Sequence, residues 1–141
     1  LMNNPIEFHY ETDFLLENTE YYIKWIKDVI AKENKELGEV NYIFCDDKYL
    51  LEKNIKYLDH DTLTDVITFS YCEGDVISSD IMISVERVME NSSIFENSFS
   101  EELNRVIIHG ILHLVGYNDK TEKEKEIMRK KEDYYINNFV I

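Results

Sequence analysis

One stretch organises the chain: residues 109–119, which read HGILHLVGYND. Its two histidines, His109 and His113, are four residues apart in an apolar run, and a helix places residues at this spacing on one face. Gly116 follows, and glycine is the usual residue where a helix ends in a left-handed turn. Such a turn would bring Asp119 back to the histidines. Three protein ligands leave a tetrahedral zinc ion one open position for water, as in catalytic zinc sites. The alternative is that both histidines are structural core residues.

Composition places the protein among globular domains. The 141 residues are 44% hydrophobic and 31% charged, so we expect one domain over residues 1–141. No apolar run is long enough to cross a bilayer, and the start of the chain is polar without a signal-peptide pattern. Cys45 and Cys72 match no zinc or redox spacing, which favours free thiols and a cytoplasmic location. We expect a monomer that does not bind membranes.

Net charge restricts the partners. With 15 basic and 29 acidic residues the net charge is −14, and such acidity disfavours non-specific binding to nucleic acid or anionic lipid. A polyanionic substrate would therefore have to meet a local basic patch.

The periodicity predicts an α+β fold in the order β, α, β, α, β, β, α, α. A short additional helix around residues 87–89 would be capped by Ser84. Gly38 would end the connection before the second strand, and Thr121 would cap the last helix in a Thr-x-x-Glu capping box. We expect one small sheet of about four strands packed with helices, and a zincin-like metal site on a buried helix that begins at residues 100–102 and continues to 115. The predicted strands are residues 6–11, 40–45, 64–69 and 76–85.

Residues 109–119 resemble the signature of the YbeY family, HGxLHLxGYDH, and residues 64–69, TDVITF, resemble its strand motif T(D/N)VLSF. The resemblance covers roughly residues 54–131. It implies a zinc-dependent, single-strand-specific endoribonuclease that acts in ribosomal RNA maturation and ribosome quality control, with the ribosome or a ribosomal subunit as partner. It also implies one Zn²⁺ per chain, held by His109, His113 and Asp119. The catalytic group would be the water on that zinc or the ribose 2′-hydroxyl, and no side chain is assigned as general base.

Two positions depart from the family pattern. Asp119 stands where the signature has histidine, and its negative charge should make a zinc-bound water a weaker acid. Leu58 stands where the family often has an arginine that is thought to hold substrate phosphate. The candidates to replace that arginine are Lys53, Lys56 and His60.

Two other functions remain open. A zinc metallopeptidase of metzincin type would use His-Glu-x-x-His, but here the glutamate position is Gly110, which cannot accept a proton. A non-enzymatic ribosome-assembly adaptor with a structural metal would need a fourth ligand. The polar loop Asp59, His60 and Asp61 could supply it, although a solvated loop is the better interpretation.

Overall fold

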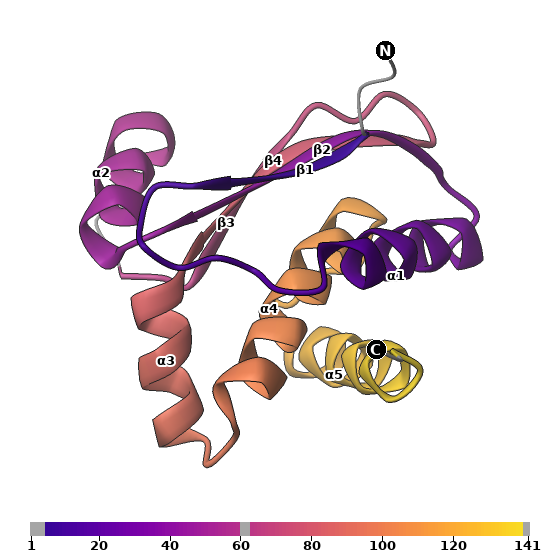
Figure 1. The fold of residues 1–141 in the computed structure, drawn as a ribbon. Helices are drawn as coiled ribbons and strands as arrows, with labels where there is room; N and C mark the ends of the chain where they lie inside the picture. Colours follow the sequence, from indigo (N-terminus) through magenta and orange to yellow (C-terminus); the bar gives the residue numbers. More distant parts are fainter. Residues whose placement is uncertain (1–4, 60–62, 140–141) are drawn as a thin grey trace.

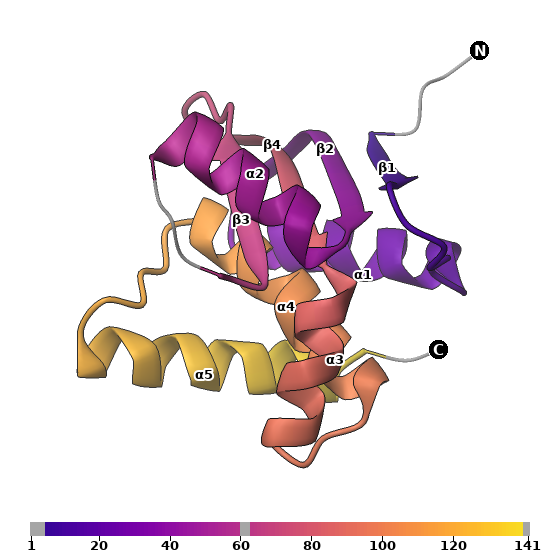
Figure 2. The same cartoon turned by 90° about the vertical axis from the view of Figure 1, so that its left-hand side faces the viewer.

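A four-stranded sheet divides the structure into two unequal sides (Figures 1 and 2). The computed structural model describes residues 5–59 and 63–139. Helices α1 and α4 pack on one face of the sheet and α5 packs on α4, whereas α2 covers the opposite face beside β3 and β4. In chain order the elements are β1 Ile6–Tyr10, α1 Thr19–Lys32, β2 Glu36–Cys45, α2 Asp47–Leu58, β3 Val66–Ser70, β4 Val76–Ser84, α3 Val85–Ile94, α4 Phe99–Leu114 and α5 Glu122–Asn137.

The strand order is β1-β2-β4-β3. The pairs β1/β2 and β2/β4 are parallel, and their long connections contain α1 in the first case and α2 with β3 in the second. Strand β3 is antiparallel to β4 and lies at the edge of the sheet. Gly74, with φ 58, occupies the turn between them, a conformation that glycine adopts without strain. This hairpin places β3, which carries the second family-like motif, at the sheet edge nearest to α4.

The larger core lies between the sheet and α4. Alternate residues of β4, among them Ile81 and Ile83, are fully buried, as the two-residue period of a strand predicts. Helix α4 lies close against the sheet at Gly110, where a Cβ would lie 3.3 Å from Ile81 Cγ2 and 3.4 Å from Thr68 Cγ2. This close approach brings the neighbouring His109 against β3. A smaller core of Cys45, Leu50 and Ile67 lies beneath α2 on the other face.

The α+β fold and the four strands agree with the sequence prediction, and so do several predicted caps. Ser84 accepts a hydrogen bond from the Arg87 backbone and begins α3, which is longer than expected. Thr121 and Glu124 form the predicted capping box of α5. Across residues 5–59 and 63–139 we find no helix with the length and apolarity of a membrane span.

Several predicted boundaries were wrong. Strand β2 begins at Glu36, so Gly38 lies inside it, and the β2–β4 register shifts between Leu37 and Val40. A Cβ at Gly38 would lie 2.1 Å from Ser78 Oγ, so this glycine permits close strand contact rather than ending a loop. Helix α4 begins at Phe99, one residue before the predicted start, because Ser98 and Glu101 form a capping box. Strand β3 begins at Val66, two residues later than predicted.

Candidate metal centre

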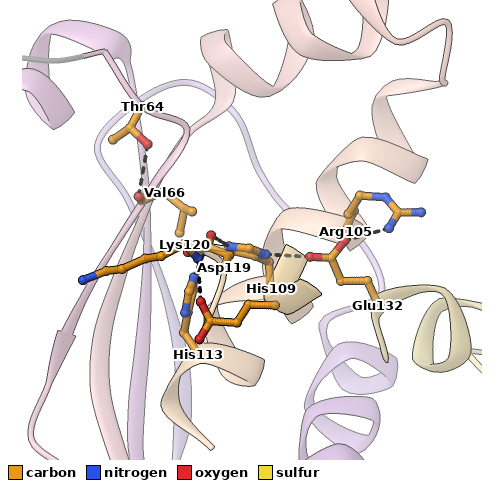
Figure 3. A network of polar contacts seen from close by, with 9 residues as sticks. Thr64, Val66, Arg105, His109, His113, Asp119, Lys120 and Glu132 are labelled. Carbon is orange, nitrogen blue, oxygen red and sulfur yellow. Dashed lines mark hydrogen bonds and ion pairs between the residues drawn. The ribbon is translucent and has the colours of Figure 1, made fainter. Parts of the chain in front are cut away.

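The three side chains singled out in residues 109–119 meet at the end of α4 (Figure 3). The rings of His109 and His113 lie one turn apart with centroids 4.5 Å apart and nearly perpendicular planes. After α4 ends, Gly116 has φ 119, a backbone conformation that favours glycine, and the chain turns back. Asp119 Oδ2 then lies 3.3 Å from His109 Nε2 and 3.2 Å from His113 Nε2.

These distances fit a shared metal ion. Two ligand atoms at the usual zinc bond lengths from a tetrahedral centre are about 3.3–3.4 Å apart. The two nitrogen–oxygen distances, 3.3 and 3.2 Å, are close to that value, and one ligand atom from each residue lies within 4.8 Å of the others. The donor set of two imidazoles and one carboxylate is also one that zinc accepts. The site can therefore hold a metal ion, and the identity of the metal stays a prediction.

Glu132 on α5 contacts His109 at Nδ1, the ring nitrogen that does not contact Asp119. Its Oε2 lies 2.6 Å from His109 Nδ1, and only 7% of its side chain is exposed. Its other oxygen accepts a hydrogen bond from Arg105 Nη1 at 2.7 Å, which fixes the carboxylate. An imidazole that donates from Nδ1 presents the Nε2 lone pair toward Asp119 and His113, as metal-binding histidines commonly do.

Sequence analysis missed Glu132. The sequence pattern of the last helix was used only to predict its capping box, and Glu132 was given no role. The helical spacing contains the missing signal, because the buried residues of α5 are Met128, Glu132 and Tyr135, which recur at positions i, i+4 and i+7. A glutamate within that stripe must face the protein interior.

Negative charge around His109 favours a cation at its ring. Burial alone would lower the His109 pKa, but the hydrogen bond and charge of Glu132 raise it, and the charges of Asp119 and Asp65 add to the effect. The net result is a pKa above the ordinary value of 6.5. The same carboxylates would favour a metal cation in place of the proton.

A cavity of about 360 Å³ opens in front of the three side chains. Its walls come from α2, from the segment that leads into β3, and from β3 itself. Asp65 is the other acidic residue of the lining, and burial raises its pKa. Leu58, the position that departs from the family pattern, contributes an apolar wall. The lining residues are Asn54, Leu58, Thr64, Asp65, Val66, Ile67, Thr68, His109, His113 and Asp119.

The loop that carries Asp119 is anchored by Glu33, at the end of α1. Tyr117 OH donates to Glu33 Oε1 at 2.7 Å, and Lys131 Nζ lies 3.3 Å from Glu33 Oε2. Tyr135 OH donates to the same carboxylate. Glu33, which is itself held by Lys131 and Tyr135 of α5, thus fixes the loop at Tyr117, two positions before Asp119. No feature of the local sequence indicated this.

Of the three suggested fourth ligands, Asp59 is the one that the structure describes, and it is not part of the cluster. Asp59 is the C-cap of α2, with φ 54, and does not belong to the group of converging ligand atoms. His60 and Asp61 lie outside the described residues.

Comparison with known proteins identifies the family. A family model described as Endoribonuclease YbeY matches residues 7–140. The chain belongs to the YbeY family. Among curated YbeY proteins, that of Flavobacterium psychrophilum is 57% identical over 128 residues, covering 91% of each chain. That of Flavobacterium johnsoniae is 54% identical over 131 residues, covering 93% of this chain and 94% of its own.

A solved structure has a similar fold. The solution structure of TM1509 from Thermotoga maritima matches with a TM-score of 0.66 and 30% sequence identity. The match covers 93% of this chain and 86% of that one. The YbeY resemblance expected over residues 54–131 therefore extends over nearly the whole chain, including β1 and α1.

Proposed function

We propose that this protein is a metal-dependent endoribonuclease that cleaves single-stranded ribosomal RNA during maturation and quality control. The observation that carries the proposal is the convergence of His109, His113 and Asp119 at an open cavity, in a chain whose YbeY relatives are named endoribonucleases. Because the donor set has three members, we assign one Zn²⁺ per chain with a coordination position left for water or substrate.

Zinc bound by these residues would lower the pKa of a bound water molecule, although less than with a third histidine in place of Asp119, and would polarise a phosphoryl oxygen. The protein's own groups prepare the site. Glu132 orients His109, and Arg105 holds Glu132 in place. Gly116 and the Glu33 anchor bring Asp119 to the histidines. The apolar side chain of Leu58 offers no hydrogen bond to phosphate, so phosphate contacts must come from other residues.

The peptidase alternative is disfavoured by the packing of α4. A metzincin-type site needs a glutamate directly after the first histidine. That position is Gly110, and the space beside its Cα is filled by Ile81 and Thr68 at 3.3 and 3.4 Å from a built Cβ. A side chain there would meet the sheet instead of reaching the cavity.

The adaptor alternative needs a closed metal site. Structural zinc sites usually have four protein ligands. Within residues 5–59 and 63–139, the only group of converging ligand atoms consists of His109, His113 and Asp119. Three ligands beside a cavity favour an open, catalytic arrangement.

The test is cleavage of labelled ribosomal RNA fragments, single-stranded and duplex, by purified protein with zinc, with a chelator, and with zinc restored. We expect cleavage of the single strand, loss with chelator, and recovery with zinc. His109→Ala should be inactive and should lack bound metal by elemental analysis. His9→Ala, which removes an imidazole with 49% of its side chain exposed on β1, is the matched control and should retain both.

Contaminating nuclease is controlled by the same pair, because both variants pass through identical purification. Equal cleavage by wild type and His109→Ala would overturn the assignment, as would failure of the zinc-loaded protein to cut either free or ribosome-bound RNA. The ribosome is the expected partner, since a chain with net charge −14 should bind naked RNA weakly.

A further inference from the structure

Helix α2 presents two neighbouring pairs of side chains to two neighbouring cavities. Asn54 and Leu58, four residues apart, line the metal cavity. Lys53 and Tyr57, each one position earlier, line a second hollow of about 290 Å³. Residues four apart share a helix face, and the two pairs are one position apart, so the two cavities lie at neighbouring faces of α2. The residues that line the second hollow are Tyr49, Lys53, Tyr57, Phe69, Tyr71, Asp80 and Met82.

Two tyrosine rings on this surface are exposed and held in place. Tyr57 is 55% exposed and Tyr71 60% exposed. The Tyr57 ring packs edge to face against Phe69, with centroids 5.9 Å apart and planes at 85°. The Tyr71 hydroxyl donates to Asp80 Oδ2 at 3.2 Å. A ring that is already ordered loses little conformational entropy when a ligand stacks on it.

Two lysines accompany these rings. Lys53 Nζ lies 5.1 Å from the Tyr49 centroid and 5.7 Å from the Tyr57 centroid, and Lys56 Nζ lies 5.1 Å from the Tyr57 centroid. Neither lysine forms a salt bridge with an acid in the described part of the chain, whereas Lys35 pairs with Asp75. In a protein of net charge −14, two cations that pair with no acid among the described residues are a local basic site.

We propose that this tyrosine–lysine surface, comprising Tyr49, Lys53, Lys56, Tyr57 and Tyr71, binds nucleotides of single-stranded RNA that flank the bond cleaved at the metal centre. The inference deepens the proposed function and rests on it. Unpaired bases stack on aromatic rings and ammonium groups contact the phosphates, which is how single strands are bound without sequence preference. Bases in a duplex are hidden from such rings, so the surface would select single strands.

The surface also compensates for Leu58. Because Tyr57 precedes Leu58 on α2, RNA that leaves the metal cavity over this helix meets Tyr57 and Lys53 next. Asp80 marks the far limit of the surface, since its carboxylate repels phosphate and is engaged by Tyr71 and Asn41.

The test compares binding of labelled single-stranded RNA in the His109→Ala background, where RNA stays intact. Fluorescence anisotropy is measured with a dinucleotide and a dodecanucleotide. Tyr57→Ala should raise the dissociation constant for the longer RNA about tenfold, within the range for loss of one stacked base. The paired change Lys53→Gln and Lys56→Gln should reduce the slope of log affinity against log salt by about 1.4, the value for two single-strand phosphates.

A matched control exists on α5. Tyr134 is 51% exposed, and Lys32 Nζ lies 5.8 Å from its ring centroid, but neither residue lines the metal cavity or its neighbour. Tyr134→Ala should leave affinity for both RNAs unchanged. The gain in affinity from dinucleotide to dodecanucleotide should shrink in Tyr57→Ala and Tyr71→Ala and persist in Tyr134→Ala.

The outcomes separate this inference from the proposed function. If Tyr57→Ala and the lysine pair bind the longer RNA as tightly as Tyr134→Ala, the inference is wrong, even when the otherwise unmodified protein cleaves RNA. A protein occupant of this surface would give that result. If the variants lose affinity while the protein with His109 intact fails to cleave, the surface binds RNA and the nuclease assignment fails.

Discussion

The Glu33 anchor yields the most quantitative prediction. Glu33 accepts hydrogen bonds from Tyr135, Tyr117 and Lys131, and only 11% of its side chain is exposed. We expect Glu33→Ala to destabilise the fold substantially and to loosen the loop that carries Asp119.

The magnitude follows from the burial of the donors. Tyr135 is only 3% exposed, so its hydroxyl would lose its acceptor without gaining water, at a cost of about 1–3 kcal/mol. Tyr117 is partly exposed, and its lost hydrogen bond should cost about 1 kcal/mol. Lys131, with 37% of its side chain exposed, can be rehydrated. The expected decrease in the free energy of unfolding is therefore about 2–4 kcal/mol.

The assay is urea unfolding at neutral pH, followed by circular dichroism. Asp28→Ala is the control, because it removes an exposed acid from the same helix and should change stability by less than about 0.5 kcal/mol. A double-mutant cycle with Tyr117→Phe should show coupling, since both changes remove the same hydrogen bond. If Glu33→Ala were no less stable than Asp28→Ala, the anchor would have no energetic role.

Acid should remove this contribution. Burial would raise the Glu33 pKa, but the hydrogen bonds from Tyr135, Tyr117 and Lys131 together lower it below the usual 4.5. A carboxyl whose pKa is lower in the folded state contributes stability above the unfolded-state pKa and loses it as pH falls through the folded-state pKa. The stability difference between wild type and Glu33→Ala should thus be constant near neutrality and shrink below about pH 4.5. A difference that grew on acidification would contradict the argument.

Three further predictions concern the metal and its helix. A chelator should lower the melting temperature of wild type but not of His113→Ala. A metal that binds only the folded state, at a free concentration a thousand times its dissociation constant, adds about 4 kcal/mol to the free energy of unfolding. Equal shifts in the two proteins would argue against His113 as a ligand. Glu132→Gln should weaken metal affinity about 10- to 100-fold in competition with a chromophoric chelator, since His109 loses its charged partner; an unchanged affinity would show that this contact is dispensable. Ser98→Ala should cost about 1 kcal/mol of stability in thermal unfolding, and Ser100→Ala less than half as much, because Ser98 is the observed cap of α4; the reverse order would restore the predicted start of the helix.

Local patterns in the sequence were sufficient to predict the fold class and the central triad. The spacing of His109 and His113 follows from the helical period, and Gly116 predicts the turn that returns Asp119. The capping box of Thr121 and the cap at Ser84 depend on residues three positions apart, so they too could be predicted without knowledge of the tertiary structure.

Boundaries were predicted less well where packing overrides local preference. Gly38 resembles a loop residue in the sequence, yet it lies inside β2. The position needs glycine because the neighbouring strand leaves no room for a side chain. The predicted start of β3 at Thr64 was two residues early, since pairing with β4 begins at Val66.

By itself, therefore, the sequence determined which three residues converge at the candidate metal site, because their geometry depends on one helix and one turn. Only the tertiary structure decided what holds that triad in place. Glu132 reaches His109 from 23 residues away, and Glu33 reaches Tyr117 from 84 residues away. Contacts at such separations depend on which faces of α1, α4 and α5 meet. That choice is made by burial of apolar surface over the whole core, and no short-range pattern records it.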